Sequence, residues 1–135
     1  MNNDTTDVDI QIQARLDENG QLTCKAAHLI AGELDVDPLY IGDQATVNGI
    51  RITRCQLGFF GYAEKKGMPG YKIVRKLDRV PEAIATAVRQ AAKSGSISCA
   101  AVWDIGEAQG ISKSDMGNIA ETLGVKVHPC QLGCF

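Results

Sequence analysis

The sequence has few aromatic residues and no long apolar run. Phe, Trp and Tyr make up 5% of the 135 residues, while hydrophobic residues make up 44%. The core must therefore be built from Ala, Val, Ile and Leu, and the Ala-rich stretches favour closely packed helices. No stretch approaches the roughly 18 apolar residues of a membrane span, and the polar start 1–9 has no apolar signal segment. We expect a cytoplasmic protein with no membrane partner.

The sequence also lacks the motifs of common enzyme classes. It contains no G-x-G-x-x-G, no Walker loop, no H-E-x-x-H and no G-x-S-x-G. We therefore expect no enzyme but a binding module. The net charge of -2 and the pI near 5.6 count against a protein that holds nucleic acid mainly through its phosphates.

What the sequence does contain is an internal repeat. Cys24 aligns with Cys99 and Cys55 with Cys130, both pairs 75 positions apart and without a gap. Twelve identical pairs fall within residues 20–60 and 95–135, including the ending C-Q-L-G-x-F. Such self-similarity predicts a tandem duplication.

The second copy has clear start and stop signals for three helices and a strand. Helices are expected to begin at Ser, Thr, Asp or Asn caps or with Pro in the first turn, and to end at Gly. The first helix is expected to begin at Pro81-Glu82 and to end at Ser94-Gly95. The second is expected to begin at Ser96 or Ser98 and to end at Gly110, and the third to begin at Ser112 or Ser114 and to end at Gly124. An alternating strand follows at 125–127.

This order predicts a mainly α fold with a short β hairpin, formed by a tandem duplication of a winged helix-turn-helix-like unit. In the first copy, strands at 50–53 and 71–74 around a Gly-rich basic loop would form the wing. In the second copy, we expect the strand at 125–128 to pair with a strand of the first copy. The predicted organisation is a flexible N-terminus (1–9), copy one (10–60), a basic hairpin and connector (61–80) and copy two (81–135).

Residues 95–112 carry a resemblance to a known family. Gly95-Ser96-Ile97-Ser98-Cys99-Ala100-Ala101, followed by a helix and Gly110-Ile111-Ser112, resembles the helix-turn-helix of the molybdate-responsive repressor family. The resemblance covers about residues 81–124 and implies a winged-helix DNA-binding domain. The repeated C-Q-L-G motif also resembles small uncharacterised prokaryotic proteins.

Basic and amide side chains form the candidate nucleic-acid interface, because Arg, Lys and Asn contact phosphates and base edges. The alternatives are a solvated hairpin and a helix-turn-helix that holds a protein partner or only a scaffold. The candidates are Arg51, Arg54, Lys65, Lys66, Lys72, Lys113 and Asn118.

The repeated cysteines are candidate metal ligands. We expect no cofactor, but four converging thiolates would suit Zn²⁺. The alternatives are buried cysteines that act as small apolar side chains and redox or disulfide chemistry. The set is Cys24, Cys55, Cys99 and Cys130. His128, Cys130 and Cys134 form a second, local group of ligand-type side chains.

The two C-Q-L-G turns are a candidate partner-binding surface. Gln followed by Gly also suits a bend, in which the amide satisfies backbone groups and Gly adopts a positive φ. The residues are Gln56, Leu57, Gly58, Gln131, Leu132 and Gly133. We expect Trp103 to fill space between the units, and no chemical role for His28.

The sequence therefore predicts a non-enzymatic, winged-helix DNA-binding or transcriptional regulatory protein. Its alternative is a protein-interaction or metal-responsive adaptor that uses the repeated cysteines and turns. Partners would be DNA or a protein, with a homodimer as one arrangement.

Overall fold

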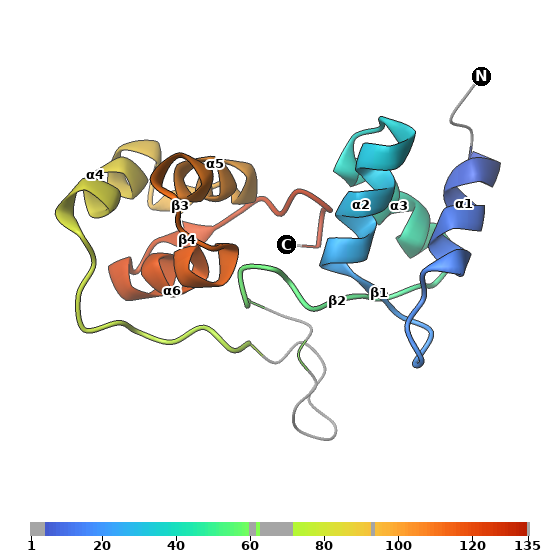
Figure 1. Ribbon diagram of the computed structural model, residues 1–135, viewed down its shortest axis with the longest axis horizontal. Coiled ribbons are helices and arrows are strands. Elements are labelled where there is room, and N and C mark those ends of the chain that lie inside the picture. The colour runs from blue at the N-terminus through green and yellow to red at the C-terminus, as the bar shows by residue number, and fades with distance from the viewer. Residues whose placement is uncertain (1–4, 60–61, 63–71, 93, 135) are drawn as a thin grey trace.

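The computed structural model describes residues 5–59, 62, 72–92 and 94–134 (Figure 1). Within this part of the chain the fold is mainly helical, as predicted, with six helices and four strands of two residues each. None of the helices in these ranges has the length and apolar character needed to cross a membrane.

The elements fall into two units at opposite ends of the molecule, and unit two repeats the element order of unit one (Figure 1). Unit one contains α1 (Thr5–Ala14), β1 (Leu22–Thr23), α2 (Cys24–Leu34), α3 (Pro38–Val47) and β2 (Ile52–Thr53). Unit two contains α4 (Glu82–Ala91), β3 (Ser96–Ile97), α5 (Cys99–Gln109), α6 (Lys113–Leu123) and β4 (Lys126–Val127).

Helix α5 shows why the local signals in the sequence were informative. Ser98 is its N-cap, and its hydroxyl accepts the N–H of Ala101 at 3.1 Å. Thr23 caps α2 at the equivalent position, with the N–H of Ala26 at the same distance. Gly110 ends α5 in the left-handed conformation, at φ 71°. Caps of this kind satisfy backbone groups at helix ends, so they fix the boundaries locally.

Each short strand pairs in parallel with a strand of its own unit. Leu22 pairs with Ile52, and Ile97 pairs with Val127, in equivalent registers. The prediction that the strand at 125–128 pairs with copy one is therefore wrong. Because β3 runs directly into α5, it already offers β4 a backbone partner inside unit two.

The predicted wing hairpin is wrong for the residues that can be assessed. Residues 72–74 do not form a strand, and Tyr71 lies outside the described residues. The N–H of Ile73 donates to the carbonyl oxygen of Gly58 at 2.8 Å, and the chain then follows α6. Helix α6 supplies side-chain hydrogen-bond partners there, so no strand partner is needed.

The predicted flexible N-terminus at 1–9 overlaps the first helix. Helix α1 begins at Thr5, and Val8 and Ile12 are fully buried in unit one. Burial of these two apolar side chains, one turn apart on one face, holds the helix in place.

The two hydrophobic cores exchange their C-Q-L-G turns. Cys130 and Leu132 of the second turn are buried in the core of unit one, whereas Cys55 and Leu57 of the first turn are buried in the core of unit two. The backbone of each turn lies directly on a helical glycine of the other unit. A Cβ at Gly42 in α3 would overlap the carbonyl oxygen of Leu132, and a Cβ at Gly117 in α6 would overlap that of Leu57.

Candidate functional site

The exchanged turns give the two units a pseudo-twofold arrangement. His28 in α2 and Trp103 in α5 occupy equivalent positions of the repeat, and their rings lie 4.4 Å apart at an interplanar angle of 43°. A contact between equivalent positions places the pseudo-twofold axis between these two rings. Trp103 thus packs between the units.

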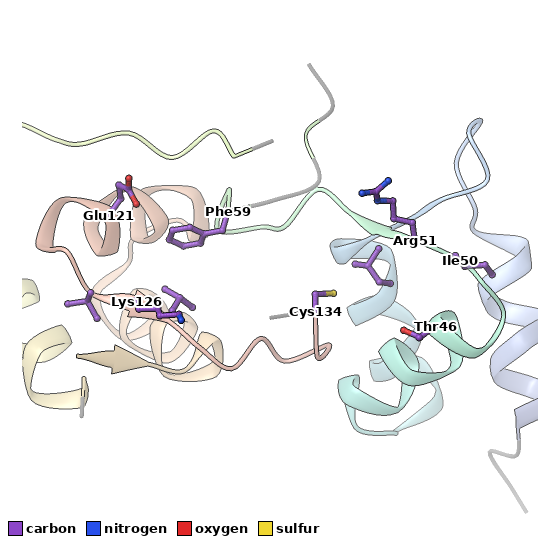
Figure 2. Close-up of a pocket in the computed structure, with 10 residues that line it drawn as sticks. Thr46, Ile50, Arg51, Phe59, Glu121, Lys126 and Cys134 are labelled. Carbon is purple, nitrogen blue, oxygen red and sulfur yellow. The ribbon is translucent and has the colours of Figure 1, made fainter. Parts of the chain in front are cut away.

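A cavity of about 630 Å³ lies between the units (Figure 2). Every residue that lines it has its repeat partner in the lining as well, so the cavity also lies on the pseudo-twofold axis; we call it the axial cavity. The five pairs are Thr46/Glu121, Ile50/Val125, Arg51/Lys126, Ile52/Val127 and Phe59/Cys134.

The axial cavity combines apolar walls with two cations. Apolar side chains form five of the ten lining residues, and Arg51 and Lys126 place one cation from each unit at the cavity. Neither cation forms an ion pair with a residue that the structure describes. Glu121 is the acid in the lining, and Lys72 already neutralises it at 3.1 Å. The cavity therefore has an excess of positive charge.

The sequence indicates Arg51 as a candidate site residue but does not indicate the cavity. The repeat contains a pattern that corresponds to this lining, because a cation stands between two β-branched residues in both copies, at 50–52 and at 125–127. That alternation was interpreted as a strand alone. The two segments face one cavity only because the units exchange their turns, which no local pattern indicates.

The four repeated cysteines are buried, and none of them forms a disulfide. Gln56 Nε2 donates to Sγ of Cys24 at 3.9 Å, and Gln131 Nε2 donates to Sγ of Cys99 at 3.4 Å. Burial raises the pKa of Cys24 to about 12 and also raises the pKa of Cys99. Thiols held neutral at physiological pH pack as small apolar groups.

The proposed metal ligands are not assembled into a centre. Among the described residues, no group of three or more His, Cys, Asp or Glu side chains is arranged to hold a metal ion. This holds for the set Cys24, Cys55, Cys99 and Cys130. It holds equally for the group of His128, Cys130 and Cys134.

The C-Q-L-G turns serve the structure itself. Each Gln binds a cysteine of its own unit, while the following Leu enters the core of the other unit. Gly58 and Gly133 have φ of 92° and 80°, a conformation that favours glycine. Leu57 and Leu132 are buried, so they are not available to an external partner.

Cys130 and Cys134 form a distinct thiol pair. Hydrogen bonds from the Cys134 thiol and from the backbone N–H groups of residues 132–134 lower the pKa of Cys130 to about 6, although burial opposes this. The same hydrogen bond and burial raise the pKa of Cys134. Cys134 is exposed and lines the axial cavity.

The candidate nucleic-acid residues that the structure describes have different contacts. Lys65 and Lys66 lie outside the described residues. The others have separate environments: Arg51 lines the axial cavity, Arg54 lies over the Tyr62 ring at 5.7 Å, Lys72 pairs with Glu121, Lys113 lies over the Trp103 ring at 4.5 Å, and Asn118 binds the chain that follows Lys72.

The segment Lys72–Leu77 covers part of α6. Asn118 Oδ1 accepts the N–H of Arg75 at 3.0 Å, and Thr122 Oγ1 accepts the N–H of Leu77 at 2.8 Å. In a helix-turn-helix protein, α6 would enter the DNA groove. In this chain, the connector occupies side chains that would face the bases.

No family model, curated protein or solved structure matches this chain.

Proposed function

We propose that the chain is a non-enzymatic binding module that holds a small dianion with an apolar body in the axial cavity. The observation that carries this proposal is the pairing of Arg51 with Lys126 across the pseudo-twofold axis, each between β-branched apolar residues. A volume of about 630 Å³ falls within the usual range of small-molecule sites. We include a cytoplasmic location, which the free state of all five cysteines supports.

The chemistry of the lining defines the ligand class. Ile50, Ile52, Val125 and Val127 offer burial to an apolar body, and the two unpaired cations offer charge-assisted hydrogen bonds to anionic groups. A ligand with an anionic group at each end would match one cation from each unit.

Titration of ¹⁵N-labelled protein with decanedioate tests the proposal. We expect saturable amide shifts at residues 50–52 and 125–127, with weaker binding of decanoate and still weaker binding of the dimethyl ester. Arg51→Gln and Lys126→Gln should each weaken decanedioate binding roughly fivefold, because a partly exposed charged contact contributes about 1 kcal/mol. Arg89→Gln, which changes an exposed cation in α4 outside the cavity, is the matched control.

Two results would reject this function. One is the absence of saturable shifts at both segments. The other is equal binding of the diacid and its dimethyl ester, since the cations would then contribute nothing.

Regulatory DNA binding through a tandem duplication of helix-turn-helix-like units is our second proposal, and unit one supports it. Its α2–α3 pair has the order of a helix-turn-helix, and Asp43 and Val47 of α3 stay exposed where the equivalent residues of α6 contact the connector. Asp37 and Asp43 would face phosphate, so compensation must come from basic residues nearby. Fluorescence anisotropy with duplex DNA over a salt series tests this; no binding at low salt would eliminate it.

A further inference from the structure

The second C-Q-L-G turn carries a thiol that the first turn lacks. Position 134 is Cys, whereas the equivalent residue in copy one is Phe59. Cys134 is exposed and lines the axial cavity, while Cys130 is only 7% exposed. The pair therefore combines one exposed thiol that lines the cavity with one buried thiol four residues before it.

The turn folds Cys134 back onto Cys130. The N–H of Gly133 donates to the carbonyl oxygen of Cys130 at 3.1 Å, which closes the turn. The N–H of Leu132 donates to Sγ of Cys130 at 3.4 Å, and the Cys134 thiol also hydrogen-bonds to this sulfur. Cys130 and Cys134 thus stand at the two ends of one closed turn, and the Cys134 side chain is the largest cause of the lowered pKa of Cys130.

The first turn is an internal comparison. Backbone N–H groups of residues 57–59 hydrogen-bond to Cys55, as those of residues 132–134 do to Cys130. Burial nevertheless raises the pKa of Cys55, whereas Cys130 has the added thiol donor and a lowered pKa. The second thiol is what distinguishes the two turns.

We infer that Cys130 and Cys134 form a redox-active dithiol that exchanges with low-molecular-weight disulfides entering the axial cavity. At neutral pH the pair holds one proton, on Cys134, and the Cys130 thiolate accepts this proton as the exposed Cys134 sulfur becomes the nucleophile. It attacks one sulfur of R–S–S–R, which breaks the S–S bond and releases one RS⁻. Cys130 loses the remaining proton to solvent and attacks the Cys134 sulfur, which forms the internal disulfide and releases the second RS⁻. The protein loses two electrons and the one proton that the pair held, and the small disulfide gains both electrons and leaves as two thiolates, which take up protons from solvent.

Anionic disulfides should be the preferred reactants. Arg51 and Lys126 line the same cavity as Cys134, so they would attract a carboxylate-bearing disulfide. This preference rests on the proposed function, whereas the exchange itself does not.

Peptide mapping after treatment with excess hydroxyethyl disulfide, which is neutral, tests the exchange. Trypsin cleaves after Lys126, so both thiols fall in the single peptide 127–135. We expect this peptide to lose two hydrogens and to resist alkylation before any other cysteine is modified. In Cys134→Ser, the two-hydrogen loss should disappear. Full alkylation of the wild-type peptide, or a disulfide that joins two peptides, would overturn the inference.

A gain-of-function variant tests the role of the second thiol without disturbing Cys130. Phe59→Cys restores in the first turn the residue type found at position 134. After the same treatment, peptide 55–65 should also lose two hydrogens. If this peptide stays fully reduced in the folded variant, the turn geometry does not produce the reactive pair.

Oxidised glutathione, which is dianionic, tests the preference separately. It should react faster than hydroxyethyl disulfide. The double variant Arg51→Gln, Lys126→Gln should lower the rate with oxidised glutathione at least roughly tenfold relative to the rate with hydroxyethyl disulfide, because two partly exposed charge contacts are lost. Loss of the advantage with unchanged hydroxyethyl disulfide rates supports both proposals. Equal rates for both reagents in the wild type would refute the anionic preference and leave the dithiol intact.

Discussion

His28 links the packing between the units to pH. Burial, together with the nearby charge of Lys113, lowers the pKa of His28 to about 4 from the ordinary 6.5. Its ring rests against Trp103, and the Lys113 ammonium lies 4.5 Å from the centroid of the Trp103 ring. Protonation of His28 is therefore unfavourable in the folded chain.

We expect stability to fall as the pH drops from about 6.5 to about 4. In this window the unfolded chain binds a proton at His28 and the folded chain does not, so protonation favours unfolding. Above the window His28 is neutral in both states. Urea midpoints across this range should fall less steeply for His28→Phe, which keeps a ring against Trp103. Identical slopes for the two proteins would contradict the assignment.

Gly42 and Gly117 fix the approach of the exchanged turns. Ala at either position is expected to lower the free energy of unfolding by about 1–3 kcal/mol, since the new Cβ meets a backbone oxygen that no rotamer change can move. Gly32→Ala in α2 is the matched control, because no atom lies within 4 Å of its Cβ. There we expect a gain of up to about 1 kcal/mol from helix propensity.

Urea unfolding of the three glycine variants measures these differences. If the Gly42→Ala and Gly117→Ala variants are as stable as the wild type, the turns do not lie on α3 and α6.

Helix α6 differs from α3 because the connector segment 72–77 lies on it. We expect Asn118→Ala to increase hydrogen exchange of the Arg75 amide roughly tenfold, because the loss of one hydrogen bond of about 1–1.5 kcal/mol releases this N–H. Asp43→Ala, at the equivalent position of α3, should leave that rate unchanged. An Arg75 amide that exchanges equally fast in all three proteins would show that the connector does not rest on α6.

The boundaries of α5 and α6 could be predicted from sequence because their causes are local, whereas α4 ends at Ala91, before the predicted end at Ser94-Gly95. Ser98, Ser112, Gly110 and Gly124 act within one turn of their helices. The partner of β4 and the path of residues 72–77 depend on contacts with distant segments, so the periodicity of the sequence did not contain them. The helix α1 was missed because its polar first residues obscured Val8.

The candidate site was predictable only in part. The sequence indicates Arg51 as a basic residue and Cys130 and Cys134 as a local group of ligand-type side chains, but the cavity that Arg51 and Cys134 both line combines residues of both copies. The sequence left Leu57 and Leu132 as candidates either for a partner-binding surface or for a structural bend, because repetition of a sequence does not indicate which unit buries it.

At the scale of the whole molecule, the chain is built like a symmetric dimer within one polypeptide. Each core is completed by a turn from the other unit, and the pseudo-twofold axis passes near the His28–Trp103 contact and the axial cavity. The cavity, its two cations and its thiol pair therefore depend on the exchange of the two turns.

Nuclear Overhauser effects between α-protons test this exchange most directly. The position of a Cβ built on Gly42 lies 3.2 Å from the Cα of Leu132, and the same distance relates Gly117 to Leu57. We expect cross-peaks between the α-protons of Gly42 and Leu132 and between those of Gly117 and Leu57. Cross-peaks that instead join Gly42 to Leu57 and Gly117 to Leu132 would place each turn in its own unit and contradict it.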